Sequence, residues 1–302
     1  MWFVLLACAT PTPTATPEAP APRAVQMALN WYPEPEFGGF YEAKLSGAAA
    51  AAGIDLTLVP GGPGVPVLEL LEARRVDVAI TGADDLLVRR AKGLDAVAIF
   101  PGFQDSPLGL MSHADAGLRR FEDVRGTVAI EQGSPFQLFL ASRYAWGDAV
   151  RMVPTSGTIG PFAADPTLVQ QAYITSEPCI AEAQGLKVDF LPGRDAGWNP
   201  YASLVVVRAE DKDTPWVAAL RGAVRAGWEG YLADPSRANV EISKANLNLA
   251  PAQLDCVVAR QRPFVTGTDG LGVMTAARWD AIEAALDAIG QEVEADGAWG
   301  GE

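Results

Sequence analysis

The stretch that decides the fold is residues 76–100, which read VDVAITGADDLLVRRAKGLDAVAIF. The stretch begins with an apolar run over 76–80 and ends with a second apolar run over 96–100. Between them lie a small polar turn and an amphipathic segment over 84–92. Short apolar runs joined by a helical segment are typical of buried parallel strands. Residues 76–100 therefore predict a strand–helix–strand unit of an α/β sheet.

The same alternation continues along the chain. Apolar runs predict further strands at 25–29, 54–59, 127–130, 150–153, 169–174, 188–191 and 204–207. Helices are expected between these strands, and longer ones follow at 215–233, 235–245, 251–260 and 276–294. The fold class that we predict is α/β, with parallel or mixed sheets and helices on both faces of each sheet.

The alternation restarts once, which divides the chain into two lobes. We expect a first lobe over 24–110, a second lobe over 111–201, and a return to the first lobe over 202–302. Crossings between the lobes are expected near 105–112 and 199–204, and two such crossings form a hinge. Ligands of open α/β sheets bind beyond the carboxyl ends of the strands, so we expect a ligand cleft between the lobes.

The first 23 residues predict an anchor and a spacer. The stretch Leu5-Leu6-Ala7-Cys8 resembles the end of a bacterial lipoprotein signal, in which the cysteine is acylated. The alternative is an apolar N-terminus with an unrelated cysteine. Residues 10–22 are rich in Pro, Thr and Ala and predict an extended linker. No later segment approaches the roughly 18 continuous apolar residues of a membrane span. We therefore expect Cys8 to carry a lipid that tethers the chain to a bacterial membrane.

Composition excludes several classes of partner and chemistry. The formal net charge is −14, which repels phosphate backbones and argues against nucleic-acid binding. The single histidine, His113, leaves no cluster for a zinc site of the usual kind, and we expect no metal and no cofactor. Cys179 and Cys256 lie far apart in the sequence, so two buried thiols are favoured over a disulfide between them.

An aromatic loop after the first predicted strand is the first candidate ligand contact. Residues 30–41 read NWYPEPEFGGFY, with five aromatic residues and two glycines. Aromatic rings offer flat faces for stacking, and an asparagine side chain both donates and accepts hydrogen bonds. The two glycines permit close approach of the backbone. Candidate contacts are Asn30, Trp31, Phe40 and Tyr41; the alternative is that the rings only fill the core.

Three other strand ends, near residues 81, 132 and 176, share a second pattern. Each passes through a short polar turn into a helix start, where free backbone N–H groups can bind carbonyls, ring nitrogens or anions. Ordinary helix capping is the alternative reading. The candidate residues are Thr81, Asp84, Gln132, Ser134, Ser176 and Glu177.

The predicted second crossing adds Trp198, Asn199 and Tyr201 to the candidates. We expect an aromatic ring from this segment to close over a ligand held by the first loop. A site with several aromatic side chains and few cations suits a planar, neutral heteroaromatic ligand.

Several of these segments resemble one protein family. Asn30-Trp31-Tyr32-Pro33, residues 38–43 (GGFYEA), Asp77-Val78-Ala79-Ile80 and the region 163–178 are similar to solute-binding proteins of the group that carries thiamine pyrimidine precursors. This type II periplasmic-binding-protein group also includes a fungal pyrimidine synthase and sulfonate-binding proteins. The resemblance implies an ABC importer, with a membrane permease as partner and a pyrimidine precursor, riboflavin or an alkanesulfonate as ligand. Residues 33–37 lack the histidine expected in pyrimidine binders, which leaves riboflavin open.

We therefore expect a monomeric, extracytoplasmic binding protein and no enzyme. Its expected solute is a thiamine pyrimidine precursor or riboflavin; the alternative is an alkanesulfonate or an aromatic acid. A pyrimidine-synthase-like enzyme is a remote alternative, because its histidine and cysteine-rich segment have no counterpart here. A hydrolase would need a nucleophile, a base and an orienting group, and Gly133-Ser134-Pro135 does not match the usual nucleophile motif. A signalling or adhesion module is a third class.

Overall fold

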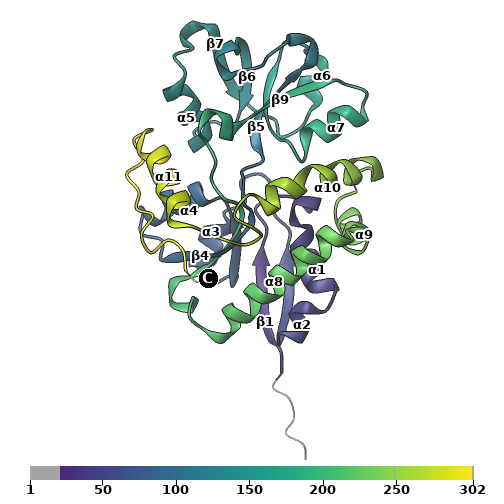
Figure 1. The fold of residues 1–302 in the computed structure, drawn as a ribbon, viewed down its shortest axis with the longest axis vertical. Coiled ribbons are helices and arrows are strands. Elements are labelled where there is room, and N and C mark those ends of the chain that lie inside the picture. Colours follow the sequence, from purple (N-terminus) through teal and green to yellow (C-terminus); the bar gives the residue numbers. More distant parts are fainter. Residues whose placement is uncertain (1–20, 248, 301–302) are drawn as a thin grey trace, which may run out of the picture.

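The computed structural model describes residues 21–300 except residue 248. Cys8 and most of the Pro/Thr/Ala linker lie outside the described residues. Two five-stranded mixed sheets stand one above the other, each covered by helices on both faces (Figure 1). The α/β fold class with two lobes is confirmed.

The first sheet has the strand order β2-β1-β3-β10-β4. Strands β1 (Arg23–Ala28), β2 (Ile54–Val59) and β3 (Val78–Thr81) are parallel. Strand β10 (Ala202–Arg208) runs antiparallel between β3 and β4 (Ala96–Phe103). Strands β3 and β4 are buried along their whole length, which explains why they read as continuous apolar runs.

Helices cover both faces of this first sheet. One face carries α1 (Gly38–Leu45), α2 (Ala48–Ala51), α8 (Pro215–Ala233), α9 (Ser236–Ala245) and part of α10 (Pro251–Thr266). The other face carries α3 (Val67–Glu72), α4 (Ala83–Arg90) and α11 (Ala276–Asp287).

The second sheet repeats this plan, with the order β7-β6-β8-β5-β9. Its members are β5 (Leu108–His113), β6 (Gly126–Ile130), β7 (Val150–Pro154), β8 (Val169–Tyr173) and β9 (Val188–Pro192), packed with α5 (Pro135–Arg143), α6 (Gly160–Ala164) and α7 (Glu177–Ala183). Strand β5 pairs antiparallel with β8 and β9. The sequence analysis read residues 105–112 as a crossing and missed β5, because the crossing and the strand are continuous in the chain.

Both crossings are held together by polar contacts at one place. The Asn199 side chain donates to Asp105 at 2.8 Å and accepts from the Ser106 backbone at 2.8 Å. Arg278 at the start of α11 donates to the carbonyls of Gln104 at 2.7 Å and Asn199 at 3.0 Å. The hinge is therefore a compact network that joins the two crossings.

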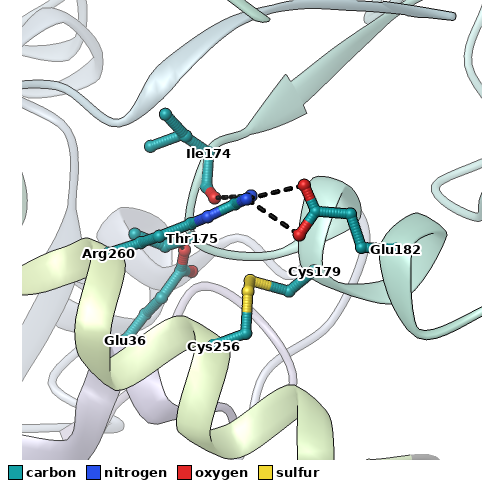
Figure 2. Close-up of a disulfide and its surroundings, with 7 residues drawn as sticks. All are labelled: Glu36, Ile174, Thr175, Cys179, Glu182, Cys256 and Arg260. Atoms are coloured by element: carbon teal, nitrogen blue, oxygen red, sulfur yellow. Dashed lines mark hydrogen bonds and ion pairs between the residues drawn. A yellow bond between two sulfur atoms is a disulfide. The ribbon is translucent and has the colours of Figure 1, made fainter. Parts of the chain in front are cut away.

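The expectation of two free thiols is wrong, because Cys179 and Cys256 form a disulfide. The two residues are separated by 77 positions in the sequence, yet their Cα atoms lie 5.8 Å apart. Cys179 lies in α7 of the second lobe and Cys256 lies in α10, and the packing of these two helices brings the sulfurs together (Figure 2). Sequence spacing contains no information about that contact.

Candidate ligand-binding cleft

Polar residues that follow strands of the two sheets contact one another where the lobes meet. In the first lobe, β1 runs into a loop that ends in the 3-10 turn η1 (Pro35–Phe37). In the second lobe, β8 runs into Thr175 and Ser176, directly before α7. The Thr175 hydroxyl donates to Glu36, and the Ser176 hydroxyl donates to Glu34 at 3.3 Å. Carboxyl groups of one lobe thus meet hydroxyl groups of the other.

Burial changes the protonation of these carboxyl groups. Glu36 is 6% exposed. Burial raises its pKa to about 7, against the lowering effect of the Thr175 hydrogen bond. Burial, with the charges of Glu36 and Glu177, raises the pKa of Glu34 well above its usual range. Burial also raises the pKa of Glu177, although the Tyr173 backbone N–H donates to it at 2.8 Å. We call Glu34, Glu36, Thr175, Ser176 and Glu177 the disulfide side of the cleft, since Cys179 follows in the same helix.

A second group of carboxyls lies on the opposite side. Asp84 and Asp85 occupy the first turn of α4, which starts directly after β3. Burial and the charge of Asp85 raise the pKa of Asp84 to about 8. Burial and the charge of Glu131 in the second lobe raise the pKa of Asp85 to about 6, despite a 3.4 Å hydrogen bond from Thr81. We call Asp84, Asp85 and Glu131 the aspartate side of the cleft.

Trp31 of the first lobe lies beside Gly157 of the second lobe. It is half-buried and follows β1. A Cβ atom added to Gly157 of the second lobe would lie 3.7 Å from the Trp31 ring, so the two residues face each other across the gap. The Trp31 indole also hydrogen-bonds Glu34. One aromatic ring and six carboxyl groups thus border the same space.

The structure brings part of the predicted site together. Thr81, Asp84, Ser176, Glu177 and Trp31 border the cleft as described. Asn30 is half-buried at the end of β1, one residue before Trp31. Ser134 caps α5 by accepting from the Gln137 backbone at 3.2 Å, and Gln132 donates to the Ile130 carbonyl at 3.1 Å. For these two residues the ordinary capping and turn roles account for the contacts seen.

Other predicted residues lie in the hydrophobic core or the hinge. Trp198 is 1% exposed and packs between Phe136 and Phe139 of the second lobe. Tyr201 is fully buried against Trp279, and its hydroxyl accepts from the Thr275 backbone at 3.1 Å. The structure does not bring these two rings to the cleft, and Asn199 serves the hinge network.

The aromatic loop also contributes more to the core than the sequence suggested. Phe40 is fully buried against Phe37 and Trp228, and Tyr41 is buried with them. Gly38 and Gly39 face the rings of Tyr231 and Trp228 on α8, with no room for a Cβ atom. These glycines therefore allow α1 and α8 to pack closely.

Sequence reasoning missed four acidic groups of the cleft, Glu34, Glu36, Asp85 and Glu131, and the Thr175 hydroxyl. Glu34 and Glu36 alternate with Pro33 and Pro35 in the quoted loop. A carboxylate next to a proline in the loop that follows a buried strand indicates a candidate ligand contact. It was overlooked because the surrounding rings dominate the pattern.

Among the described residues there is no group of three or more His, Cys, Asp or Glu that could hold a metal ion. None of the helices within residues 21–300 combines the length and the hydropathy that crossing a bilayer requires.

Two mixed five-stranded sheets joined by two crossings define the periplasmic-binding-protein fold. A model of the NMT1/THI5-like family matches residues 34–238, and the chain belongs to this family. The family resemblance predicted from the sequence is therefore confirmed.

Known relatives agree with this assignment. The chain is 29% identical to the riboflavin-binding protein RibY of Chloroflexus aurantiacus, over 95% of this chain and 90% of that protein. The periplasmic aliphatic sulphonate-binding protein SsuA of Escherichia coli is similar in structure, with a TM-score of 0.70, 14% identity, and coverage of 91% of this chain and 92% of that chain. The alkanesulfonate-binding SsuA of Xanthomonas axonopodis pv. citri gives a TM-score of 0.69 with 16% identity, over 93% of this chain and 99% of that chain. Identities this low demonstrate the shared fold alone.

Proposed function

We propose that this protein captures a planar, nitrogen-rich heteroaromatic nutrient in the cleft and delivers it to an ABC permease. Riboflavin or a thiamine pyrimidine precursor is the solute that fits this proposal. The observation that carries it is the set of six carboxyl groups around the cleft, none of which forms an ion pair with a Lys or Arg in the part of the chain that the structure describes.

Carboxyl groups with raised pKa values suit a solute of this kind. Near neutral pH, Glu36 and Asp84 titrate, so each can accept a hydrogen bond as a carboxylate or donate one as an acid. Pyrimidine and flavin rings present donors and acceptors side by side along one edge. A buried donor left unpaired costs about 1–3 kcal/mol, so such carboxyls favour rings that can pair with them.

Trp31 supplies the apolar part of the proposed site. A ring stacked on an indole contributes about 1 kcal/mol beyond the area that it buries. Because Trp198 and Tyr201 are packed in the core, we propose that the second lobe closes over the solute with the loop around Gly157 and not with an aromatic ring.

The competing solute class is an alkanesulfonate or an aromatic acid. The structural likeness to the two sulfonate-binding proteins makes this class the alternative candidate for the cleft. A sulfonate is permanently anionic, and the cleft carboxyls that remain ionised would repel it, with no Lys or Arg ion-paired to them among the described residues. The acidic lining therefore favours the heteroaromatic solute.

Calorimetric titration of riboflavin, hydroxymethylpyrimidine and an alkanesulfonate tests the proposal. We expect one of the two heteroaromatic compounds to bind, and Trp31→Ala and Glu177→Gln to weaken that binding at least tenfold. The matched controls are Trp216→Ala, at the start of α8, and Glu72→Gln, on the exposed end of α3. Tight sulfonate binding that is unaffected by either cleft substitution would refute the proposal.

We also propose that Cys8 is acylated and that residues 9–22 hold the folded part away from the membrane. The motif ending at Cys8 and the Pro/Thr/Ala composition support this proposal. Growth of a bacterium expressing the full-length chain with labelled palmitate should label the wild type and not Cys8→Ser. Equal labelling of both, or of neither, would contradict it.

A further inference from the structure

The disulfide connects the two lobes covalently. Cys179 belongs to α7, which packs on β8 and β9 of the second lobe. Cys256 belongs to α10, which packs on η1 and β4 of the first lobe. Together with the two crossings, the disulfide is a third covalent link between the lobes (Figure 2).

A second fixed point lies on the same helix as Cys256. The Phe264 carbonyl of α10 accepts from the backbone N–H groups of Gln104 at 2.8 Å and Asp105 at 3.1 Å, where the chain first crosses between the lobes. Positions 256 and 264 differ by eight residues, which at 1.5 Å rise per residue separates the two points by about 12 Å along α10.

These two points restrict how the lobes can separate. A rigid body that is held at two points can only rotate about the line through them. Here that line follows α10 from Cys256 to Phe264. We propose that the Cys179–Cys256 disulfide makes α10 the axis of lobe opening, so that the cleft opens on the aspartate side while the disulfide side stays assembled.

The contacts around the disulfide support this division. Arg260 of α10 binds both carboxylate oxygens of Glu182 in α7, at 2.7 and 2.9 Å, and its guanidinium lies 3.5 Å from the Ile174 carbonyl (Figure 2). On the opposite face, the hydrogen bond between α5 and α11 within the described residues runs from Ser142 to the Ala288 carbonyl at 3.5 Å. On that side α5 and α11 are held by this hydrogen bond and by packing of their apolar side chains, with no covalent bond among the described residues.

The consequence is a half-site that exists before any solute arrives. Cys179 follows Glu177 by two positions in one helix, so a fixed Cys179 keeps the start of α7 against η1. The hydrogen bonds of Thr175 to Glu36 and of Ser176 to Glu34 then persist in the open state. The solute would enter from the aspartate side and dock on a preformed wall. This inference concerns the motion of the lobes and does not depend on the identity of the solute.

Pulsed electron–electron distance measurements on the ligand-free, full-length chain test it. Spin labels would be carried by non-natural amino acids, so that no cysteine is added. The pair Gln184–Asp255 reports on the disulfide side, and the pair Ala141–Lys92 reports on the aspartate side; all four residues are exposed. In the oxidised wild type we expect a narrow distribution for Gln184–Asp255 and a broad one for Ala141–Lys92.

Breaking the disulfide should remove that difference. In Cys179→Ser/Cys256→Ser, or in the wild type reduced with dithiothreitol if that variant fails to fold, the Gln184–Asp255 distribution should broaden towards longer distances. Glu182→Gln, which removes the ion pair and keeps the disulfide, should leave it narrow. An unchanged distribution after disulfide cleavage, equal broadening in Glu182→Gln, or a narrow Ala141–Lys92 distribution in the wild type would overturn the inference.

Discussion

The two sides of the cleft carry the same kind of side chain but are held together by different means. On the disulfide side, Glu34 and Glu36 contact hydroxyl groups of the other lobe, beside a disulfide and a bidentate ion pair. On the aspartate side, Asp84 and Asp85 face Glu131 with no partner of opposite charge from the other lobe among the described contacts. The acids of the disulfide side, Glu34 and Glu36, are buried beside a covalent link, whereas Asp84 is half-buried and Asp85 and Glu131 are exposed. The difference suggests that one side positions the solute and the other side admits it.

The largest expected effect comes from removing the restraint itself. The disulfide spans 77 residues of sequence. Closing a loop of that size stabilises the folded chain by about 4 kcal/mol in the chain-entropy model. We expect the free energy of unfolding, measured in guanidinium chloride, to fall by that order when the oxidised chain is reduced. Cys179→Ser/Cys256→Ser should then show no further response to reductant, and a fall below about 1 kcal/mol in the wild type would contradict the estimate.

The next effect is on the pH dependence of stability, and it should differ between the two sides. The pKa of Glu36 rises from 4.5 to about 7 on folding. Between these values the folded chain binds more protons than the unfolded chain, so its stability decreases as pH rises. The loss is at most about 3.4 kcal/mol, at about 1.36 kcal/mol for each unit of pKa. We expect the unfolding temperature of the ligand-free chain to fall from pH 5 to pH 8, and Glu36→Gln to flatten that slope.

The aspartate side provides the comparison for this experiment. Its carboxyls can hydrate when the lobes open, so Asp84→Asn should flatten the slope less than Glu36→Gln does, despite the higher pKa of Asp84 in the closed structure. Glu72→Gln on the exposed end of α3 should leave the slope unchanged. A larger effect of Asp84→Asn than of Glu36→Gln would show that opening does not relieve the aspartate side.

The smallest expected effect belongs to the ion pair of Arg260 and Glu182. Their side chains are 29% and 41% exposed, so solvent screens most of the attraction. We expect Glu182→Gln to cost about 0.5–1 kcal/mol of unfolding free energy, and less at high salt. Lys244→Gln, which removes an exposed pair on α9, is the matched control and should cost less. A cost above about 2 kcal/mol would show that the ion pair, and not the disulfide alone, holds α7 against α10.

The sequence predicted the fold well because periodicity reports local structure. The apolar run at 96–100 became part of the fully buried strand β4, and the alternating residues 54–59 became the partly exposed edge strand β2. The antiparallel insertion of β5 and β10 was not predicted, because strand order depends on contacts between distant segments. The same limit explains the disulfide.

The site was predicted less well, for a different reason. Trp31 and Trp198 look alike in a loop sequence, but one borders the cleft and the other is enclosed by Phe136 and Phe139. The position of Glu34 between two prolines is typical of an exposed loop, but contact with the second lobe buries its side chain. Burial is a property of the folded chain, so the sequence pattern alone could not predict the raised pKa values of Glu34 and Glu36.

The position of β10 has a consequence for the order in which the chain folds. In the first sheet β4 pairs along its length with β10, which begins at residue 202, and its other edge bears a bridge between Ala98 and Trp299. The second sheet, by contrast, has all five strands once residue 192 has been made. During synthesis or export the second lobe can therefore complete its sheet while the first still has an unpaired edge. Cys179 remains a thiol until α10 brings Cys256 to it, so the disulfide can form only after the strands of both sheets have been made.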